Sequence, residues 1–560
     1  MDSGSILSPM LLWKDFTIKY PLQESKTSEE VFDNVIYSDV YFSGREVEDG
    51  RVRIFGVFAK SRSTKRTGKS AGILILPDAK ETVNLELVNL YVKQGYSVLM
   101  VDYRGEAAGV DNYTHYPKSL SYANYQKAAS AMDNCAVNAK KTCWYEWVAV
   151  AKYALNFLKS QRDLDTVGVL GVKAGAEIGW QLCATEEGVT CFVPLFCSGG
   201  RVFKGYYKNG EQDMPMNDDR LRFLAGLDAS AYAQYLNCPT LFLTAPNSKF
   251  SDAERCLDTF SRVPKITPTY FNFSSAFTDV LDFDSKKDVD LFFAKYLLAF
   301  KIDFPKEAKL NLTVENGVAT VTVEEPDFSV HKPKKVTTFI AEGVDNPSFR
   351  DWKELRIHSE SEGKQNYRYK ITSSASFVTA FSVITYRNGL TLSTRIAVRK
   401  FKRADSAKDN LLYSGKSVIP SVSVSSLSKK AVGGVFFNGD KPYTVKMIAG
   451  INGLYCSDGV IFNKFNSDFF RLSEYTLLKL DVFSEKYCKL NVSLIIEKKG
   501  VISEYYFDVI LKPAIVWKDV LIHLSDFKSL SGRPIDDYKG IRALKIYSDV
   551  PFAVNNMIVI

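Results

Sequence analysis

A change of hydrophobic period along the 560-residue chain most constrains what it can fold into. From about residue 50 to residue 300, short runs of β-branched and aliphatic residues alternate with longer segments of helical periodicity. This alternation is typical of a mostly parallel sheet covered by helices on both faces. Beyond Pro305 the period becomes two, which predicts antiparallel sheets. We therefore expect a multidomain chain: one doubly wound α/β unit and then two all-β sandwiches, divided as 1–303, 304–403 and 404–560.

The first part of the α/β pattern is a strand, a helix and a second strand. The sequence predicts a strand at 73–76, a helix at 85–92 that Gly95 ends, and a strand at 96–102. Further strands are predicted at 166–170, 190–196, 239–244 and 269–271, and helices around 144–158 and 292–297.

Two Asn-Gly pairs mark turns in the β-rich part. Asn316-Gly317 separates two period-two segments and predicts a type I′ hairpin. Asn388-Gly389 separates two more, so residues 304–403 are predicted to form a small antiparallel sandwich. The basic run Arg399, Lys400, Lys402 and Arg403 leads into a polar stretch that is predicted to be a linker. Alternating segments at 478–482, 490–496, 505–509, 520–524, 541–547 and 552–560 predict a second sandwich of jelly-roll type.

Charge and hydropathy argue against two kinds of partner, a nucleic acid and a membrane that the chain would span. The 72 Lys and Arg against 64 Asp and Glu give a net charge of +8, which is too small for a nucleic-acid-binding surface in a chain of this size. The densest basic patch, at 60–69, contains Ser, Thr and Gly and is typical of a solvated loop between strands. No apolar run is long enough to span a membrane. The N-terminus lacks the features of a signal peptide, so the chain is intracellular or its numbering begins after cleavage.

The nine cysteines are too dilute for a disulfide framework, and no Cys-x-x-Cys pair or Cys/His cluster predicts zinc. No cofactor is expected. Cys135 and Cys143 lie close together in sequence and could form a disulfide in an oxidising compartment. Cys183, Cys191 and Cys197 lie in apolar segments and are predicted to be core residues.

The most informative local motif follows the strand predicted at 166–170. In a doubly wound sheet, ligands bind at the carboxyl ends of the strands. Here the chain continues as Gly171-Val172-Lys173-Ala174-Gly175, which has the small flanking residues of a nucleophile elbow, Gly-x-Ser-x-Gly. Lys173 occupies the position of the nucleophile.

Residues 50–300 resemble an α/β-hydrolase, specifically carbohydrate esterases of the acetyl xylan esterase and cephalosporin deacetylase type. The motifs that carry the resemblance are ILILPDA, GYSVLMVDYRGE, THYPKSLSYANY, CWYEWVAVAKYALNFL and TVGVLGVKAGAEIGWQLCA. The segments VDNPSFRDWKE and AFSVITYRNGLTLST resemble an immunoglobulin-like sandwich that follows some of these esterases. The segments WKDVLIHLSDF, DYKGIRALKIYS and FAVNNMIVI resemble galactose-binding-like carbohydrate-binding modules.

The resemblance implies that the catalytic triad is degenerate. Lys173 stands at the serine position, Ser248 near the position of the acid with Asp252 as a substitute, and Ser275 in the segment of the base. No histidine occurs between His115 and His331. The oxyanion turn carries Asp78, whose carboxylate would repel developing negative charge. Without its triad the esterase has no acyl-enzyme route. Lys173 is expected to fill the old pocket by reaching a carboxylate such as Asp78, and a lysine base or Schiff base is the less favoured alternative.

The resemblance to sugar binders implies that flat aromatic faces in the third unit stack on sugar rings. The candidates are Tyr443, Tyr455, Tyr475, Trp517 and Tyr538, and the alternative is that they are core residues. Nearby Asp526, Arg533, Asp536 and Asp537 could bond sugar hydroxyls or a structural calcium ion.

The sequence leaves three alternative functions to be tested. The favoured one is a non-catalytic pseudo-esterase, outside the cell or on its surface, that binds a glycan or polysaccharide or acts as an accessory protein in glycan utilisation. The second is an active carbohydrate acyl esterase with relocated residues, in which His115 would lie in the pocket beside a hydroxyl such as that of Ser248 or Ser275. The third is a protein-interaction scaffold with a protein partner.

Overall fold

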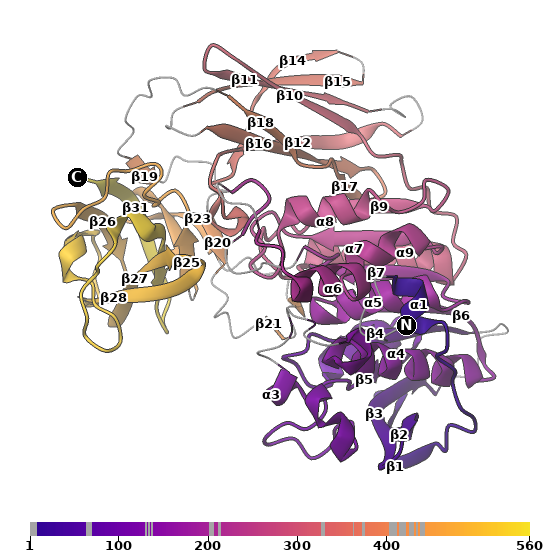
Figure 1. The fold of residues 1–560 in the computed structure, drawn as a ribbon. Helices are drawn as coiled ribbons and strands as arrows, with labels where there is room; N and C mark the ends of the chain where they lie inside the picture. Colours follow the sequence, from indigo (N-terminus) through magenta and orange to yellow (C-terminus); the bar gives the residue numbers. More distant parts are fainter. Residues whose placement is uncertain are drawn as a thin grey trace.

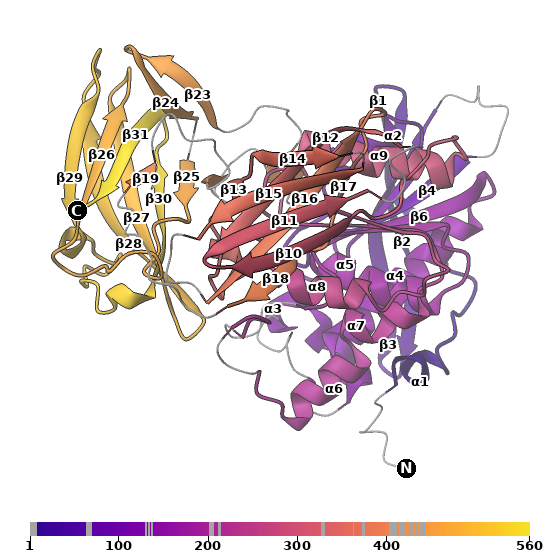
Figure 2. The ribbon, with the colours of Figure 1, turned by 90° about the horizontal axis from the view of Figure 1, so that it is seen from above.

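The computed structural model shows three units in sequence order, with the third beside the other two (Figures 1 and 2). The structure describes residues 8–62, 70–128, 132, 135, 138–200, 206–210, 214–325, 331–361, 363–371, 376–401, 411–413, 422–424, 431–432, 435–436, 443–457 and 459–560.

The first unit is built on a nine-stranded sheet in the order β1-β2-β3-β5-β4-β6-β7-β8-β9. Strands β4 to β9 are parallel, and β1, β2 and β3 add an antiparallel edge beside β5. The strands are β1 (Ser25–Phe32), β2 (Val35–Val47), β3 (Gly50–Ser61), β4 (Ser70–Leu76), β5 (Ser97–Val101), β6 (Leu164–Val172), β7 (Cys191–Leu195), β8 (Thr240–Thr244) and β9 (Thr269–Phe273).

Helices cover both faces of this sheet. They are α1 (Pro9–Trp13), α2 (Leu85–Val92), α3 (Tyr125–Ala128), α4 (Cys143–Ser160), α5 (Ala174–Thr185), α6 (Asp218–Gly226), α7 (Ala229–Tyr232), α8 (Ala253–Phe260) and α9 (Phe283–Leu297). Along β4, Ile73 and Ile75 belong to the core under α2 and α9, whereas Leu74 and Leu76 belong to the core under α4 and α5. Both faces of the strand are buried because side chains alternate across a sheet.

The helix predicted at 85–92 is α2. The Asn84 side chain caps it by accepting from the N–H groups of Glu86 and Leu87, and Gly95 follows with φ +92°. Strands β1 and β2, which precede the α/β alternation that begins near residue 50, were not predicted. All eight residues of β1 are exposed, so this strand lacks the alternation that predicts a half-buried strand.

The middle unit packs two antiparallel sheets face to face. One has the order β10-β11-β15-β14, and the other β13-β12-β16-β17 with β18 paired to β16. A shared core that includes Val321 and Tyr367 from one sheet and Ile340 and Ala380 from the other lies between them. The strands are β10 (Lys309–Glu315), β11 (Val318–Glu324), β12 (Pro333–Glu342), β13 (Lys353–Glu354), β14 (Ile357–Ser361), β15 (Lys364–Lys370), β16 (Phe377–Tyr386), β17 (Thr391–Ser393) and β18 (Ala397–Lys400).

The two Asn-Gly pairs form different turns. Asn316 and Gly317 have φ values of +48° and +73° and join Glu315 to Val318, as a type I′ hairpin requires. At the second pair only Gly389 has a positive φ, +86°, and the loop is longer because Thr385 pairs with Thr391. Strand β18 includes Arg399 and Lys400, and the start of the polar stretch predicted to be a linker lies outside the described residues.

The third unit also has two facing antiparallel sheets. Their orders are β23-β24-β31-β26-β29, with β19 on β31, and β20-β25-β30-β27-β28; β21 and β22 form a separate pair. Their shared core includes Leu480 and Val554 from one sheet and Val492 and Leu544 from the other. The strands are β19 (Leu411–Tyr413), β20 (Val422–Val424), β21 (Ala431–Val432), β22 (Val435–Phe436), β23 (Tyr443–Ile448), β24 (Ile451–Cys456), β25 (Gly459–Phe462), β26 (Leu477–Phe483), β27 (Cys488–Lys498), β28 (Val501–Leu511), β29 (Lys518–His523), β30 (Ile541–Tyr547) and β31 (Phe552–Val559).

The cysteines are buried thiols, and the disulfide considered between Cys135 and Cys143 does not form. Burial raises the pKa of the Cys135 thiol. Cys183, Cys191 and Cys197 are core residues, as their apolar context predicts. The basic patch lies between β3 and β4, and its residues 63–69 fall outside the described residues. In the described part of the chain, no helix has the length and apolar character to cross a membrane.

Candidate functional site

Lys173 occupies a strained turn between β6 and α5. Its backbone has φ +51° and ψ −110°, a conformation that costs free energy for a residue with a Cβ. The flanking glycines allow the close approach of backbone that such a turn needs. A Cβ on Gly175 would lie 2.0 Å from the Leu76 carbonyl oxygen, and one on Gly171 would lie 2.5 Å from the Gly175 oxygen. The turn therefore has the geometry of a nucleophile elbow, with a lysine at its apex.

The charge of Lys173 acts on the carboxyl group of Asp279, in the loop after β9. Burial raises the pKa of Asp279, and the charge of Lys173 lowers it. The Oδ2 atom of Asp279 accepts hydrogen bonds from the N–H groups of Lys249 (2.9 Å) and Phe250 (3.2 Å). Its buried Oδ1 atom has no hydrogen-bond partner in the described structure. Sequence reasoning missed Asp279, although it lies in the loop where the resemblance implies a base.

Ser248 is buried beside Asp279 and organises the loop after β8. Its hydroxyl accepts from the N–H groups of Ser251 (3.0 Å) and Phe250 (3.2 Å) and lies 3.3 Å from the Ser251 hydroxyl. A hydrogen bond from Ser248 also lowers the pKa of Asp279. Ser275 is exposed, and its N–H donates to the Ser285 hydroxyl at 3.2 Å.

His115 lies on the surface beside the antiparallel edge of the sheet. Its N–H donates to the Arg53 oxygen at 2.9 Å, and its exposed ring stacks on Tyr41 with centroids 5.7 Å apart. Tyr113 lies on the ring at 4.6 Å. In the described parts of the chain, no hydrogen bond joins this imidazole to a hydroxyl or a thiol. The position of His115 therefore does not support the alternative in which this residue is a relocated catalytic base.

Asp78 is buried in the segment after β4. The pKa of Tyr103 is raised, first by the burial of Tyr103 and then by the charge of Asp78. The Tyr103 hydroxyl donates to the Pro77 oxygen at 2.5 Å. Among the residues that the structure describes, Lys173 makes no ion pair with Asp78. The expected pairing of these two side chains is therefore absent, and Asp279 provides the neighbouring negative charge instead.

Asp252, the substitute considered for the acid, caps α8. One of its oxygens accepts from the N–H groups of Glu254 (3.0 Å) and Arg255 (3.3 Å), and the other accepts from Lys208 (2.7 Å). Burial, and then the charge of Glu254, raise the pKa of Asp252 to about 7. These contacts give Asp252 the role of the N-terminal cap of α8.

The aromatic candidates of the third unit differ in their surroundings. Tyr475 is 81% exposed. Trp517 donates from Nε1 to the Ile448 oxygen at 2.9 Å, and its ring lies so close to Gly453 that a Cβ there would be 2.3 Å away. Lys446 lies over the ring of half-buried Tyr455, 4.1 Å from its centroid. Tyr538 packs against the core, and the Tyr443 side chain lies outside the described residues.

The carboxylates near these aromatics have partners within the protein. Asp526 accepts from the His523 N–H at 3.2 Å, Asp537 caps a short 3-10 helix (Tyr538–Gly540), and Asp536 pairs with Lys498 at 3.3 Å. In the described part of the chain, His, Cys, Asp and Glu form no group of three or more that could hold a metal ion.

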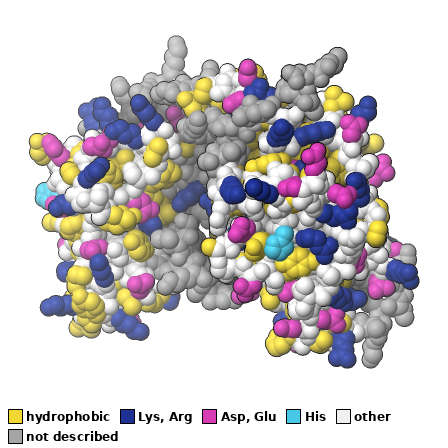
Figure 3. All heavy atoms as spheres, turned by 60° about the horizontal axis from the view of Figure 1, so that its bottom comes forward, with side chains coloured by type: hydrophobic (Ala, Val, Ile, Leu, Met, Phe, Trp, Pro, Cys, Tyr) yellow, Lys and Arg dark blue, Asp and Glu magenta, His cyan; other side chains and the backbone are white. Residues whose placement is uncertain are grey.

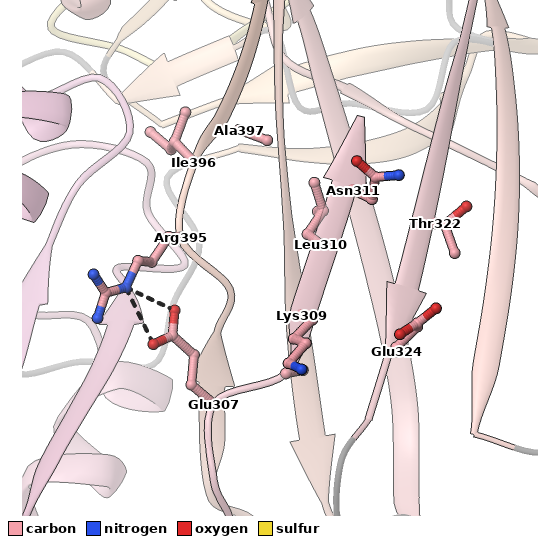
Figure 4. Close-up of a pocket in the computed structure, with 10 residues that line it drawn as sticks. Glu307, Lys309, Leu310, Asn311, Thr322, Glu324, Arg395, Ile396 and Ala397 are labelled. Atoms are coloured by element: carbon pink, nitrogen blue, oxygen red, sulfur yellow. Dashed lines mark hydrogen bonds and ion pairs between the residues drawn. The ribbon is translucent and has the colours of Figure 1, made fainter. Parts of the chain in front are cut away.

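The middle unit has an open pocket of about 680 Å³ (Figure 4). Arg395 and Glu307 form an ion pair at 3.0 Å on one side of it. None of its ten lining residues is a histidine, a cysteine or an aromatic residue, so this pocket offers no imidazole base, no thiol and no stacking face. It is lined by Glu307, Ala308, Lys309, Leu310, Asn311, Thr322, Glu324, Arg395, Ile396 and Ala397.

Comparisons with known proteins find similarity only among solved structures. No protein-family model matches the chain, and no curated protein matches it. An acetyl xylan esterase from Paenibacillus sp. R4 is 13% identical, with 52% of this chain and 92% of that chain covered and a TM-score of 0.39. Acetyl xylan esterase 1 from Thermoanaerobacterium sp. JW/SL YS485 is 14% identical over 54% of this chain and 97% of that chain, with a TM-score of 0.37. A cold-adapted esterase from an Arctic intertidal metagenomic library is 16% identical over 49% and 99%, with a TM-score of 0.32.

These identities and scores are low, so the fold is assigned from the chain itself. The mostly parallel sheet and the elbow between β6 and α5 are the features that define it. The first unit has an α/β-hydrolase fold.

Proposed function

We propose that this protein is a non-hydrolytic relative of carbohydrate esterases, which binds a glycan outside the cell or acts as an accessory protein in glycan utilisation. The observation that carries the proposal is the occupant of the elbow. Lys173 stands where the nucleophile belongs, and its neighbours are Asp279 and Ser248. The middle unit is proposed to be immunoglobulin-like, and the third unit a galactose-binding-like jelly roll.

Ester hydrolysis through an acyl-enzyme needs a hydroxyl or thiol nucleophile and a base that takes its proton. Lys173 offers an ammonium group, and the neighbouring side chains offer a carboxyl and a hydroxyl that already accepts two backbone hydrogen bonds. The surface position of His115 supports the absence of a proton relay at the elbow. Binding without turnover is the function that these groups support.

One observation favours a polyhydroxylated ligand. Tyr475 presents an exposed ring in the third unit, which suits stacking on the apolar face of a sugar ring. Basic and acidic side chains are interspersed over the face shown in Figure 3, in keeping with a ligand other than nucleic acid.

The test has a catalytic arm and a binding arm, both on the full chain. We expect no hydrolysis of acetylated xylan or of a small aryl acetate above the buffer rate. Turnover by the wild type that Lys173→Ala abolishes would contradict the proposal. In the binding arm, a glycan screen should retain at least one oligosaccharide; silence in that screen together with a co-purifying protein would favour a scaffold instead.

A further inference from the structure

We propose that strand β10 of the middle unit pairs with β10 of a second copy of this chain. The two strands run antiparallel about a two-fold axis at Leu312, so that two four-stranded sheets join into one. This interaction surface is independent of the glycan-binding function proposed above.

Strand β10 lies at the free edge of its sheet. The strand order is β10-β11-β15-β14, with β10 at one end (Figure 2). Glu315 flanks the two-residue turn to β11, and the residues that flank such a turn exchange hydrogen bonds. Since hydrogen-bonding positions alternate along an antiparallel strand, the backbone groups of Leu310, Leu312 and Val314 point to the free edge. Among the described residues they have no backbone partner there.

The sequence of β10 is complementary to itself in the antiparallel direction. From 309 to 315 it reads Lys-Leu-Asn-Leu-Thr-Val-Glu. In the register centred on Leu312, Lys309 lies opposite the partner's Glu315, and Leu310 lies opposite the partner's Val314. Opposite residues of two antiparallel strands place their side chains on the same face. The charges therefore meet on the exposed face, and the apolar residues meet on the face that belongs to the core of the sandwich.

The same register matches the backbone. The positions that point to the free edge are Leu310, Leu312 and Val314, and the two-fold axis brings each of them opposite another member of this set. Leu312 meets Leu312 of the second copy, and Leu310 meets Val314. Each such pair exchanges N–H and C=O groups that otherwise face solvent.

The two charged residues are available for these pairs. Lys309 and Glu315 are both exposed. Lys309 faces Glu324 across the hairpin, but the Glu324 carboxylate pairs with Lys364. In the described part of the chain, neither Lys309 nor Glu315 has an ion pair. Opposite charges directly across two antiparallel strands stabilise the pairing, and the two-fold axis makes this pair twice.

The pocket of the middle unit lies beside this edge (Figure 4). Its lining includes five consecutive residues, 307–311, so it follows the backbone of β10 rather than one face of the strand. Arg395, Ile396 and Ala397 line it as well. In the proposed register, the partner's Val314 and the turn that follows it enter this space. Leu310 and Ile396 then contact the partner's apolar side chain.

Two other sheet edges match less well. Strand β1 is exposed on both faces, so its pairing buries no apolar face, and its register shifts between Lys26 and Ser28. The register of β14 shifts between Ile357 and Ser359. By contrast, β10 pairs with β11 over seven residues without a shift and has one apolar face.

The proposed contact is small and closes on itself. Both copies use the same surface, so the assembly stops at two copies. Seven residues from each strand form an interface at the low end of the size range of specific complexes. We therefore expect a weak dimer, with a Kd on the order of 10 µM.

The experiment is analytical ultracentrifugation of the full chain over about 1 to 200 µM. We expect the average mass to rise from that of the monomer towards that of the dimer across this range. Hydrogen exchange at the Leu312 amide should slow at the high concentrations, because this N–H becomes paired in the dimer.

The decisive variant is Glu315→Lys. It places two lysines opposite each other at both ends of the paired strands and should raise the Kd at least about tenfold. Glu315 is exposed and faces Val318 within the hairpin, so the fold should persist, as a thermal melt can verify. The double variant Lys309→Glu, Glu315→Lys restores opposite charges and should restore the dimer.

The matched control is Glu30→Lys. Glu30 is an exposed carboxylate on the edge strand β1, and its replacement changes the net charge by the same amount. It should leave the Kd unchanged.

Three results would overturn the proposal. They are a monomer throughout the concentration range, a dimer that Glu315→Lys leaves as tight as before, and a double variant that stays as weak as the folded single variant. A dimer that Glu30→Lys weakens instead would place the contact at β1.

Discussion

The two junctions of the middle unit differ in their chemistry. Where it meets the first unit, aromatic rings from both sides share one core: Phe273 lies on Phe381 with centroids 4.5 Å apart, and Phe277 on Phe339 at 5.1 Å. Where the third unit meets the other two, a small apolar cluster is accompanied by buried polar contacts. The Arg350 backbone oxygen of the middle unit accepts from Asn463 of the third unit at 3.3 Å, and the Tyr207 hydroxyl of the first unit donates to Glu497 of the third at 3.1 Å.

The difference indicates how strongly the folding of each unit is coupled to that of its neighbour. A shared apolar core makes the first and middle units one cooperative block, because neither can separate without exposing aromatic surface. The third unit is positioned mainly by directional polar contacts, which specify an orientation but add less free energy.

The largest expected effect comes from the apolar junction. Phe381→Ala removes a ring that is 1% exposed and should lower the free energy of unfolding by about 4 kcal/mol, since it leaves a cavity in the shared core. Chemical denaturation followed by tryptophan fluorescence measures this. Loss of the middle unit's signal alone, with the first unit still folded, would contradict the single block.

Arg350→Met tests the buried ion pair between the middle unit and α8 of the first unit. Arg350 is 1% exposed, so its loss leaves the Glu254 carboxylate buried without a counter-charge and should cost about 3 kcal/mol. Chemical denaturation measures this loss of stability. The double variant Arg350→Met, Glu254→Met should recover part of the stability; an unchanged free energy of unfolding in the single variant would disprove the role of this pair.

The stability of the junction between the first and middle units should depend on pH. Asp288 accepts from the Thr391 N–H (2.8 Å) and from Asn272 (2.6 Å), and burial raises its pKa from the ordinary 3.8 to about 8. The folded state therefore holds a proton that the unfolded state releases, and stability falls as pH rises from about 4 to about 8.

The size of this slope is at most about 1.4 kcal/mol per pH unit, and Asp288→Asn should remove it. Denaturation curves of the wild type and the variant at several pH values measure the difference. Parallel curves would show that Asp288 is ionised in the folded protein throughout this range.

The smallest effect concerns a single hydrogen bond at the second junction. The Tyr207 hydroxyl donates to Glu497 of the third unit at 3.1 Å. Tyr207→Phe should weaken docking by about 1 kcal/mol without changing the first unit. Hydrogen exchange at β27 reports on this; an equal change in α4 would show that the effect is not local to the junction.

Local features of the fold were predictable from sequence. The Asn316-Gly317 turn and the helix at 85–92 were predicted because their signals lie within a few residues. Strand β1 was missed because its side chains are exposed on both faces. At the candidate site, Lys173 was predicted from the motif around it, whereas Asp279 was not, since a carboxylate in a loop is common and no local pattern distinguishes this one.

The amino-acid sequence alone establishes which catalytic groups the elbow lacks. A lysine replaces the nucleophile, and no histidine lies between His115 and His331, so no folding of that stretch can place an imidazole there. Which groups surround the lysine depended on long-range packing. Asp279 lies near it because β6, β8 and β9 are parallel strands whose carboxyl ends meet at one edge of the sheet. Asn463 reaches the Arg350 oxygen because the third unit docks on the middle unit. Periodicity and residue type belong to the chain locally, but these contacts join distant segments and exist only after strand register and unit docking are set.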